Sequence, residues 1–319
     1  MTENLEFSAR RAFLDYLKVL TDEKVFLVYD NSTEKIARAF NSAASNLKLN
    51  LSMRKIEING GNGQDPDAET CRLMSLHDVI IAPTFFSLTH CAAVKKARKT
   101  GARVATLPGI TEDVFVRGLK SSPEELDRAG EAWMKKLAGN HSIRVCSAKG
   151  TDISFTVGKA LPGNDNGCIF EKGSCQNLPS GEVYMPPDPD SGDGVLVIDG
   201  SIATQEMSDG FEPVTIKLRG GSAYSFEGKR AEDLKKKLQT FGSKAFVLAE
   251  FGIGTNSGVK LSGNLLEDEK VKGTVHFAFG NNTGFGGINE VPVHIDCIVT
   301  APDIFVDGVC CMRKGEWLI

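Results

Sequence analysis

The sequence predicts an α/β fold with two lobes, in which an N-terminal α/β lobe built on a parallel sheet is followed by a β-rich lobe. The chain has 319 residues, more than a single hydrophobic core usually supports. Strand-like and helix-like segments alternate in the first part, which is typical of a parallel sheet covered by helices. Short strands separated by Gly, Asn, Asp and Pro follow. We therefore divide the chain into residues 1–140 and residues 141–319.

In the first lobe, short apolar runs alternate with amphipathic segments. The expected strands are 25–31, 53–58, 78–84 and 102–109, and the expected helices are 5–19, 32–47, 67–76 and 122–139. Ser32 is expected to cap its helix, because a serine oxygen accepts hydrogen bonds from the free amides of a helix N-terminus. Ser122 and Pro123 suit the cap and first-turn positions of the last helix, and Gly139 ends it.

In the second lobe, the hydrophobic pattern changes to a period of two residues. The expected strands include 152–158, 194–203, 212–220 and 273–280. One clear helix is expected, at 229–242. This lobe is therefore expected to consist mostly of β-sheet.

The composition narrows the classes of partner. The chain has 37 basic and 41 acidic residues, a net charge of −4 and no basic stripe, which argues against nucleic acid and favours a small-molecule or peptide substrate. It contains no run of 18 apolar residues and no secretory apolar segment, so we expect a cytoplasmic protein without membrane association. Its eight cysteines form no CxxC pair, which indicates neither a zinc ribbon nor a disulfide scaffold.

The run EVPVHIDCIVT places a histidine and an aspartate, His294 and Asp296, on the same face of a strand. Other strand-like segments carry Glu182 in SGEVYMPP, Glu250 in VLAEFGIGTN and His276 in GTVHFAFG. A lone charged group in an apolar strand is unfavourable unless it is paired or coordinated. Together the five residues predict a site for one or two divalent ions such as Zn, Mn, Co or Fe. Taken singly, His276 also fits a hydrogen-bonded core histidine, and Glu250 a turn cap.

Other motifs carry weaker signals. The run FGIGTNSG lacks the GxGxxG spacing of a dinucleotide-binding turn. The charged run LEDEK (266–270) is expected to form a solvated turn, although Lys270 lies close enough to His276 in sequence to approach the site. Cys168 and Cys175 have no histidine close in sequence, so a thiol nucleophile is a minor alternative. Structural roles are favoured for the histidines of the first part of the chain, which are His77, His90 and His141.

The series GEVYMPP, AEFGIGTN, DEKVKGTVHFAFG, HIDC and VDG…KGEW resembles the C-terminal half of the M29 metallopeptidases, the thermophilic aminopeptidase T family. The resemblance implies a two-lobed enzyme, usually a homodimer, that removes N-terminal amino acids with a pair of divalent ions. The positions that match the family's metal ligands are Glu182, Glu250, His276, His294 and Asp296. One position departs from the family pattern, because Thr283 stands where the family has a tyrosine.

The same superfamily includes the 2,5-dihydroxypyridine 5,6-dioxygenases, shorter enzymes that hold one Fe(II) through two histidines and an aspartate. His276, His294 and Asp296 match such a set, and Phe279 and Phe285 are candidates for the wall of an aromatic pocket.

The two additional carboxylates, Glu182 and Glu250, favour a metal-dependent hydrolase in which either one moves a proton to the leaving amine. The alternatives are an Fe(II) ring-cleaving dioxygenase and a non-catalytic relative that keeps the metal site.

Overall fold

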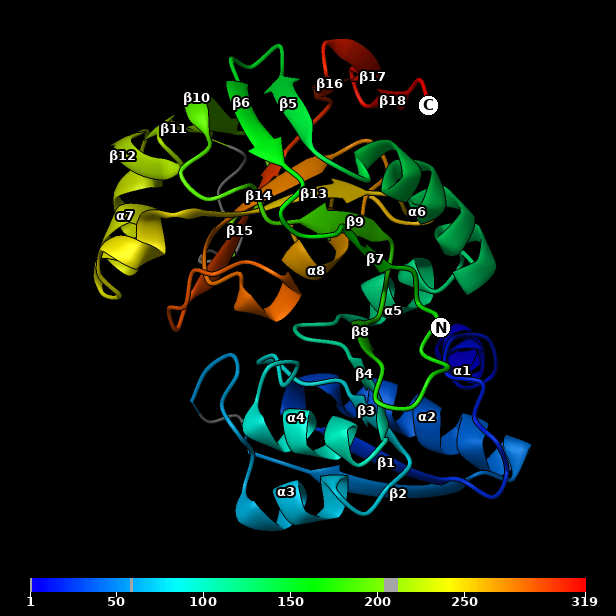
Figure 1. The fold of residues 1–319 in the computed structure, drawn as a ribbon. Helices are drawn as coiled ribbons and strands as arrows, with labels where there is room; N and C mark the ends of the chain where they lie inside the picture. The colour runs from blue at the N-terminus through cyan, green and yellow to red at the C-terminus, as the bar shows by residue number, and fades with distance from the viewer. Residues whose placement is uncertain (1, 58–59, 204–211) are drawn as a thin grey trace. The chain divides into compact units, whose positions relative to one another are not determined.

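The computed structural model describes residues 2–57, 60–203 and 212–319, and these form two compact units (Figure 1). The first unit contains residues 1–127 and 165–180, and the second contains residues 128–164 and 181–319. Helix α6 (Pro123–Leu137) spans the change from the first unit to the second. Among the described helices, none combines the length and the apolar character needed to cross a lipid bilayer.

The first unit is built on a parallel sheet of five strands in the order β2-β1-β3-β4-β8. The strands are β1 (Lys24–Tyr29), β2 (Asn50–Lys55), β3 (Val79–Ala82), β4 (Arg103–Thr106) and β8 (Cys175–Asn177). The helical segments are α1 (Thr2–Arg11), η1 (Ala12–Tyr16), η2 (Asn31–Thr33), α2 (Glu34–Leu47), α3 (Ala68–Met74), α4 (Ala92–Lys99) and α5 (Glu112–Gly118). Strands β3 and β4 are buried along their whole length, as expected for central strands of a parallel sheet covered on both faces.

Two helix starts test the predicted caps. Ser32 is not the N-cap of α2, because it lies within the short helix η2 that precedes α2. The N-cap of η2 is Asp30, whose Oδ1 accepts a hydrogen bond from the Ser32 amide at 2.9 Å. Asp30 directly follows strand β1, and its side chain accepts the hydrogen bond from the first helical turn that the Ser32 side chain was expected to accept. Ser122 does cap α6, since its Oγ accepts from the Glu125 amide at 3.2 Å and Glu125 Oε2 accepts from the Ser122 amide at 2.8 Å.

The described residues of the second unit form two antiparallel sheets. The larger has eight strands in the order β12-β11-β10-β6-β5-β16-β17-β18. These are β5 (His141–Cys146), β6 (Asp152–Val157), β10 (Asp193–Ile198), β11 (Val214–Arg219), β12 (Ser222–Glu227), β16 (Asp303–Val306), β17 (Val309–Arg313) and β18 (Glu316–Trp317). The helical segments of this unit besides α6 are α7 (Ala231–Gln239), η3 (Ser243–Phe246), α8 (Leu265–Asp268) and η4 (Thr283–Phe285).

The smaller sheet carries the residues singled out in the sequence, and its strand order is β15-β14-β13-β9-β7. Its strands are β7 (Gly163–Asp165), β9 (Glu182–Met185), β13 (Leu248–Gly254), β14 (Val275–Gly280) and β15 (His294–Val299). The two sheets share one apolar core, in which the ring of Phe155 on β6 lies 5.1 Å from Phe251 and 5.9 Å from Phe277. The predicted fold class, a parallel-sheet α/β lobe followed by a β-rich lobe, is confirmed.

Candidate metal centre

The smaller sheet of the second unit has one apolar face and one polar face. Alternate residues of its strands enter the core: Val183, Met185, Phe251, Ile253, Val275, Phe277, Phe279, Ile295 and Cys297. Since successive strand side chains point to opposite faces, the residues between them share the other face. All five predicted metal-binding residues lie there: Glu182 on β9, Glu250 on β13, His276 on β14, and His294 and Asp296 on β15.

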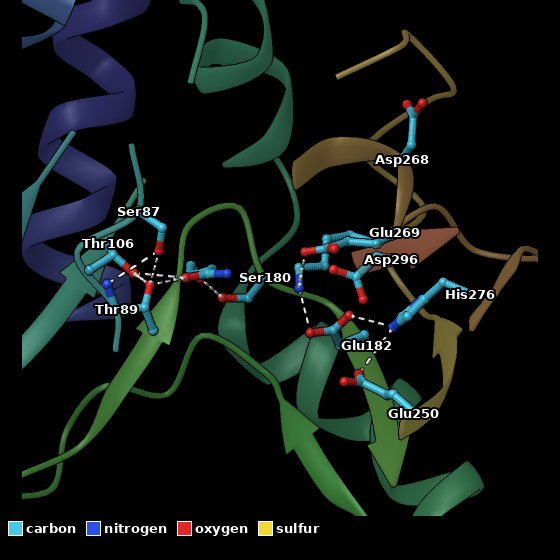
Figure 2. Close-up of polar contacts among 12 residues, drawn as sticks. Ser87, Thr89, Thr106, Ser180, Glu182, Glu250, Asp268, Glu269, His276 and Asp296 are labelled. Carbon is cyan, nitrogen blue, oxygen red and sulfur yellow. Dashed lines mark hydrogen bonds and ion pairs between the residues drawn. The ribbon is translucent and has the colours of Figure 1, made fainter. Parts of the chain in front are cut away.

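The five side chains form a continuous chain of polar contacts, part of which Figure 2 shows. His276 Nε2 lies 3.3 Å from Glu182 Oε2 and 3.4 Å from Glu250 Oε1. His294 Nε2 lies 3.1 Å from Glu250 Oε2 and 3.2 Å from Asp296 Oδ1. Both imidazoles therefore direct Nε2 toward the carboxylate of Glu250.

Two local features fix the imidazoles. His294 Nδ1 lies 2.7 Å from the carbonyl oxygen of Asn281, so Nδ1 donates a hydrogen bond to this oxygen. In the neutral ring, Nε2 then carries no proton and is able to bind a metal. Gly252 lies opposite His276 in the β13–β14 pair, and a Cβ at Gly252 would stand 1.9 Å from His276 Nε2. Glycine is therefore required where the imidazole crosses the neighbouring strand.

The donor set fits a divalent metal ion. Glu250, His294 and Asp296 offer ligand atoms that all lie within 4.8 Å of one another, and His276 points its Nε2 at the same glutamate. The Nδ1 atom of His276 is buried without a hydrogen-bond partner, and the opposite nitrogen, Nε2, is the one that faces the carboxylates. Imidazole nitrogen and carboxylate oxygen together suit Zn, Mn, Co or Fe.

The electrostatics of the site follow from burial beside opposite charges. Burial by itself would lower the pKa of His276, but the hydrogen bond to Glu250 and the charge of Glu182 raise it to about 9. Burial would likewise lower the pKa of His294, but Asp296 and Glu250 raise it well above its ordinary value. Burial would raise the pKa of Glu250, yet hydrogen bonds from the two histidines hold it well below its usual range. In the metal-free protein, two imidazolium groups therefore neutralise the carboxylates that a metal would bind.

The LEDEK run is buried, and its prediction as a solvated turn is wrong. Glu267 and Asp268 are 0 % exposed, because their carboxylates accept hydrogen bonds from the amides of a neighbouring loop: Lys260 at 3.2 Å, Ser262 at 2.7 Å and Gly263 at 3.0 Å. This turn carries Lys270 to the site, as its position before His276 suggested, and Lys270 Nζ forms an ion pair with Glu182 Oε1.

Glu269 is a site residue that the sequence did not single out. Its Oε1 lies 2.9 Å from Lys270 Nζ. Burial raises the pKa of Glu269 to about 8, against the opposing effect of Lys270. The only available signal was its place in a charged run, which by itself is more typical of a solvated turn.

The remaining candidates lie in other environments. His77 stacks on Phe26 with 4.8 Å between ring centroids, a structural role as expected. Burial raises the pKa of Cys168 and Cys175 to about 11, so both remain thiols at neutral pH and are poor nucleophiles. Thr283 is exposed, and its hydroxyl donates a hydrogen bond to the side chain of Asn281 at 2.9 Å.

The two phenylalanines proposed as an aromatic wall differ in position. Phe279 belongs to the core between the sheets. Phe285 stands edge-to-face against His294, with 6.0 Å between ring centroids, and edge-to-face against Tyr184 at 5.6 Å. An aromatic surface made by Phe285 and Tyr184 therefore adjoins the imidazole of His294.

The fold and the donor set together define a metal-binding enzyme of the superfamily that unites M29 peptidases and 2,5-dihydroxypyridine dioxygenases. Residues 8–318 match the sequence profile of the NicX family, described as 2,5-dihydroxypyridine 5,6-dioxygenase, and the chain belongs to this family.

Known relatives come from both branches. The chain is 26% identical over 245 residues to 2,5-dihydroxypyridine 5,6-dioxygenase of Pseudomonas putida, covering 72% of this chain and 68% of that protein. It is 24% identical over 202 residues to aminopeptidase AmpS of Bacillus subtilis, covering 53% of this chain and 48% of that protein. The predicted superfamily is thereby confirmed.

Solved structures from the same two branches share the fold. The 2,5-dihydroxypyridine dioxygenase of Pseudomonas putida KT2440 superposes with a TM-score of 0.81 at 21% identity, covering 99% of this chain and 96% of that one. Wild-type AmpT of Thermus thermophilus gives a TM-score of 0.72 at 17% identity, covering 99% of each chain. At these identities the structural likeness supports the architecture, and the chemistry must be argued from the site.

Proposed function

We propose that the protein is a dioxygenase that holds one Fe(II) ion and cleaves the ring of a small, electron-rich hydroxylated aromatic or N-heteroaromatic compound. The observation that carries the proposal is the convergence of two imidazoles and Asp296 beside an aromatic surface. His276 and His294 direct Nε2 toward the two carboxylate oxygens of Glu250, Asp296 lies beside His294, and Phe285 stands against the same ring. Membership of the NicX family supports the same reaction class.

The ligands, the base and the aromatic residues have separate parts in this proposal. His276, His294 and Asp296 would hold the ion as a two-histidine, one-carboxylate set. The chemistry supplied by bound Fe(II) is the activation of dioxygen toward an electron-rich ring. Glu250 faces both imidazoles, and its carboxylate would accept a proton from a ring hydroxyl of a substrate held beside the metal. Phe285 and Tyr184 would pack against the planar ring and exclude water from it.

A metal-dependent amide hydrolase of the aminopeptidase type is the second candidate, and a specific observation favours it. Two glutamates, Glu182 and Glu250, lie 3.3 and 3.4 Å from the same imidazole nitrogen of His276. A site with this many carboxylates suits the activation of a water molecule, with Glu182 or Glu250 carrying its proton to the leaving amine. The aminopeptidase relatives support this candidate.

Oxygen dependence separates the two candidates. Protein purified without oxygen would be loaded with Fe(II), or separately with Zn(II), Mn(II) or Co(II), and offered dihydroxypyridines, hydroxylated benzoates and aminoacyl anilides. We expect the Fe(II) protein alone to consume dioxygen as ring absorbance is lost, and His294→Ala to abolish this. His141→Ala is the matched control, because His141 pairs with Asp307. Amine release without oxygen uptake would replace the proposal with the hydrolase.

A further inference from the structure

A lysine ammonium lies buried at the edge of the metal centre. The side chain of Lys270 is 1 % exposed, and its Nζ pairs with Glu182 Oε1 and, at 2.9 Å, with Glu269 Oε1. Lysine is rarely buried to this extent unless it is paired, because an ammonium loses its hydration. Both of these partners are carboxylates, and Glu182 also faces the imidazole of His276.

The backbone around Lys270 holds this ammonium in place. The Lys270 carbonyl accepts a hydrogen bond from the Asn256 amide at 2.8 Å, and the Lys270 amide donates to the Glu267 carbonyl at 3.0 Å. The preceding turn is anchored by the carboxylates of Glu267 and Asp268, which bind loop amides. The backbone that carries the Lys270 side chain is therefore anchored by hydrogen bonds on both sides of the residue.

The ammonium determines what Glu182 is able to bind. One oxygen of Glu182 is taken by Lys270, and the other lies 3.3 Å from His276 Nε2. A dication that used Glu182 as a ligand would come into the immediate neighbourhood of a buried positive charge. Repulsion between like charges is strong where water is excluded. A second metal ion at Glu182 and a charged Lys270 therefore exclude each other.

We propose that Lys270 acts as a built-in monovalent cation that takes the place of a second metal ion at Glu182, and so limits the centre to one divalent ion. This inference rests on the proposed function, because it assumes that His276, His294 and Asp296 hold the first ion. Lys270 is in this sense a positioning residue, since it acts through Glu182 without itself binding the metal. A purely structural lysine would affect folding but not the number of ions bound.

Metal stoichiometry tests the inference directly. Equilibrium dialysis of the full-length protein against Mn(II), followed by elemental analysis, would compare wild type with Lys270→Ala, Lys270→Gln and Lys270→Arg. We expect one ion per chain in wild type and Lys270→Arg, and two in Lys270→Ala and Lys270→Gln, with the spin-coupled spectrum of a close Mn(II) pair in paramagnetic resonance. Lys270→Gln serves if the alanine variant does not fold. Adding Glu182→Gln to either neutral variant should return the count to one.

Lys272→Ala is the matched control. Lys272 lies two residues along the same segment, is exposed, and places its Nζ 4.5 Å from the Trp317 ring centroid. It should bind one ion, like wild type. Two ions in wild type would overturn the role of Lys270. One ion in every variant would also overturn it, but would still agree with a centre that binds one ion. A wild-type protein that binds no ion would refute the proposed function and the inference with it.

Discussion

Metal binding should release two protons, and its affinity should rise steeply with pH. The surrounding carboxylates raise the pKa of His276 to about 9 and that of His294 well above its ordinary value, so both rings carry a proton at neutral pH in the metal-free protein. A metal binds only the neutral ring, and each imidazole must therefore lose one proton. With two protons released per ion, the affinity should increase about 100-fold per pH unit between about pH 6.5 and 8.5.

The effect can be measured with Mn(II) by competition against a chelator at several pH values, or by titration calorimetry in buffers of different ionisation enthalpy. In His276→Gln only one imidazole remains to lose a proton, so the dependence should fall to about tenfold per pH unit. His141→Ala should keep the wild-type slope, because His141 pairs with Asp307 and is not among the proposed ligands. An affinity that is flat over this range would refute the reasoning, since it would mean that both rings are already neutral.

The same pKa shift predicts the opposite trend for the stability of the metal-free protein. A histidine whose pKa rises on folding contributes stability that is complete below the unfolded value and is lost as pH rises through the folded value. For His276, a rise from 6.5 to about 9 corresponds to about 3 kcal/mol. The metal-free protein should therefore lose stability over this interval, as its metal affinity increases.

Three further predictions concern other contacts. Asp307 lies 2.7 Å from His141 and raises the pKa of that histidine. Asp307→Asn should therefore lower the melting temperature more at pH 5.5, where it removes an ion pair, than at pH 8.5, where the imidazole is neutral. Glu23→Gln should lower the free energy of unfolding in urea by about 1.5–3 kcal/mol, because the buried guanidinium of Arg103 loses its charged partner at 2.5 Å and keeps the carbonyl oxygens of Leu17 and Ile169; an unchanged midpoint would contradict this. Phe285→Ala should raise KM for an aromatic substrate about 3- to 10-fold in steady-state assays, with the metal content unchanged.

The ligand face could be predicted from the sequence because strand periodicity is a local property. In HIDCIV the apolar residues Ile295 and Cys297 enter the core, which forces His294 and Asp296 to the opposite face. The same alternation applies to His276 in VHFAFG. The order of the strands in the sheet is not a local property of the sequence. The five site residues were therefore grouped by residue type and family resemblance.

Features that depend on distant partners could not be predicted. Charge alone suggested that LEDEK is solvated, but Asp268 also accepts a hydrogen bond from the hydroxyl of Ser201, 67 positions earlier in the chain. Residues 175–177 lie in a polar stretch without a strand pattern, yet they join the parallel sheet beside β4, about 70 positions earlier in the chain. Such pairings are set by tertiary contacts that override local propensity.

The two glutamates of the site differ in their partners, and this difference bears on the class of reaction. Glu250 is shared by two imidazoles, so one dication can replace their two protons there without changing the net charge of the site. Glu182 is shared by His276 and Lys270, and once the first ion holds His276, a second ion at Glu182 would have to be accommodated beside the ammonium. Two enzymes that share all five ligand positions can therefore differ in metal number. The residue that decides between one-ion and two-ion chemistry then lies outside the ligand set, so conservation of the ligands is weak support for conservation of the reaction.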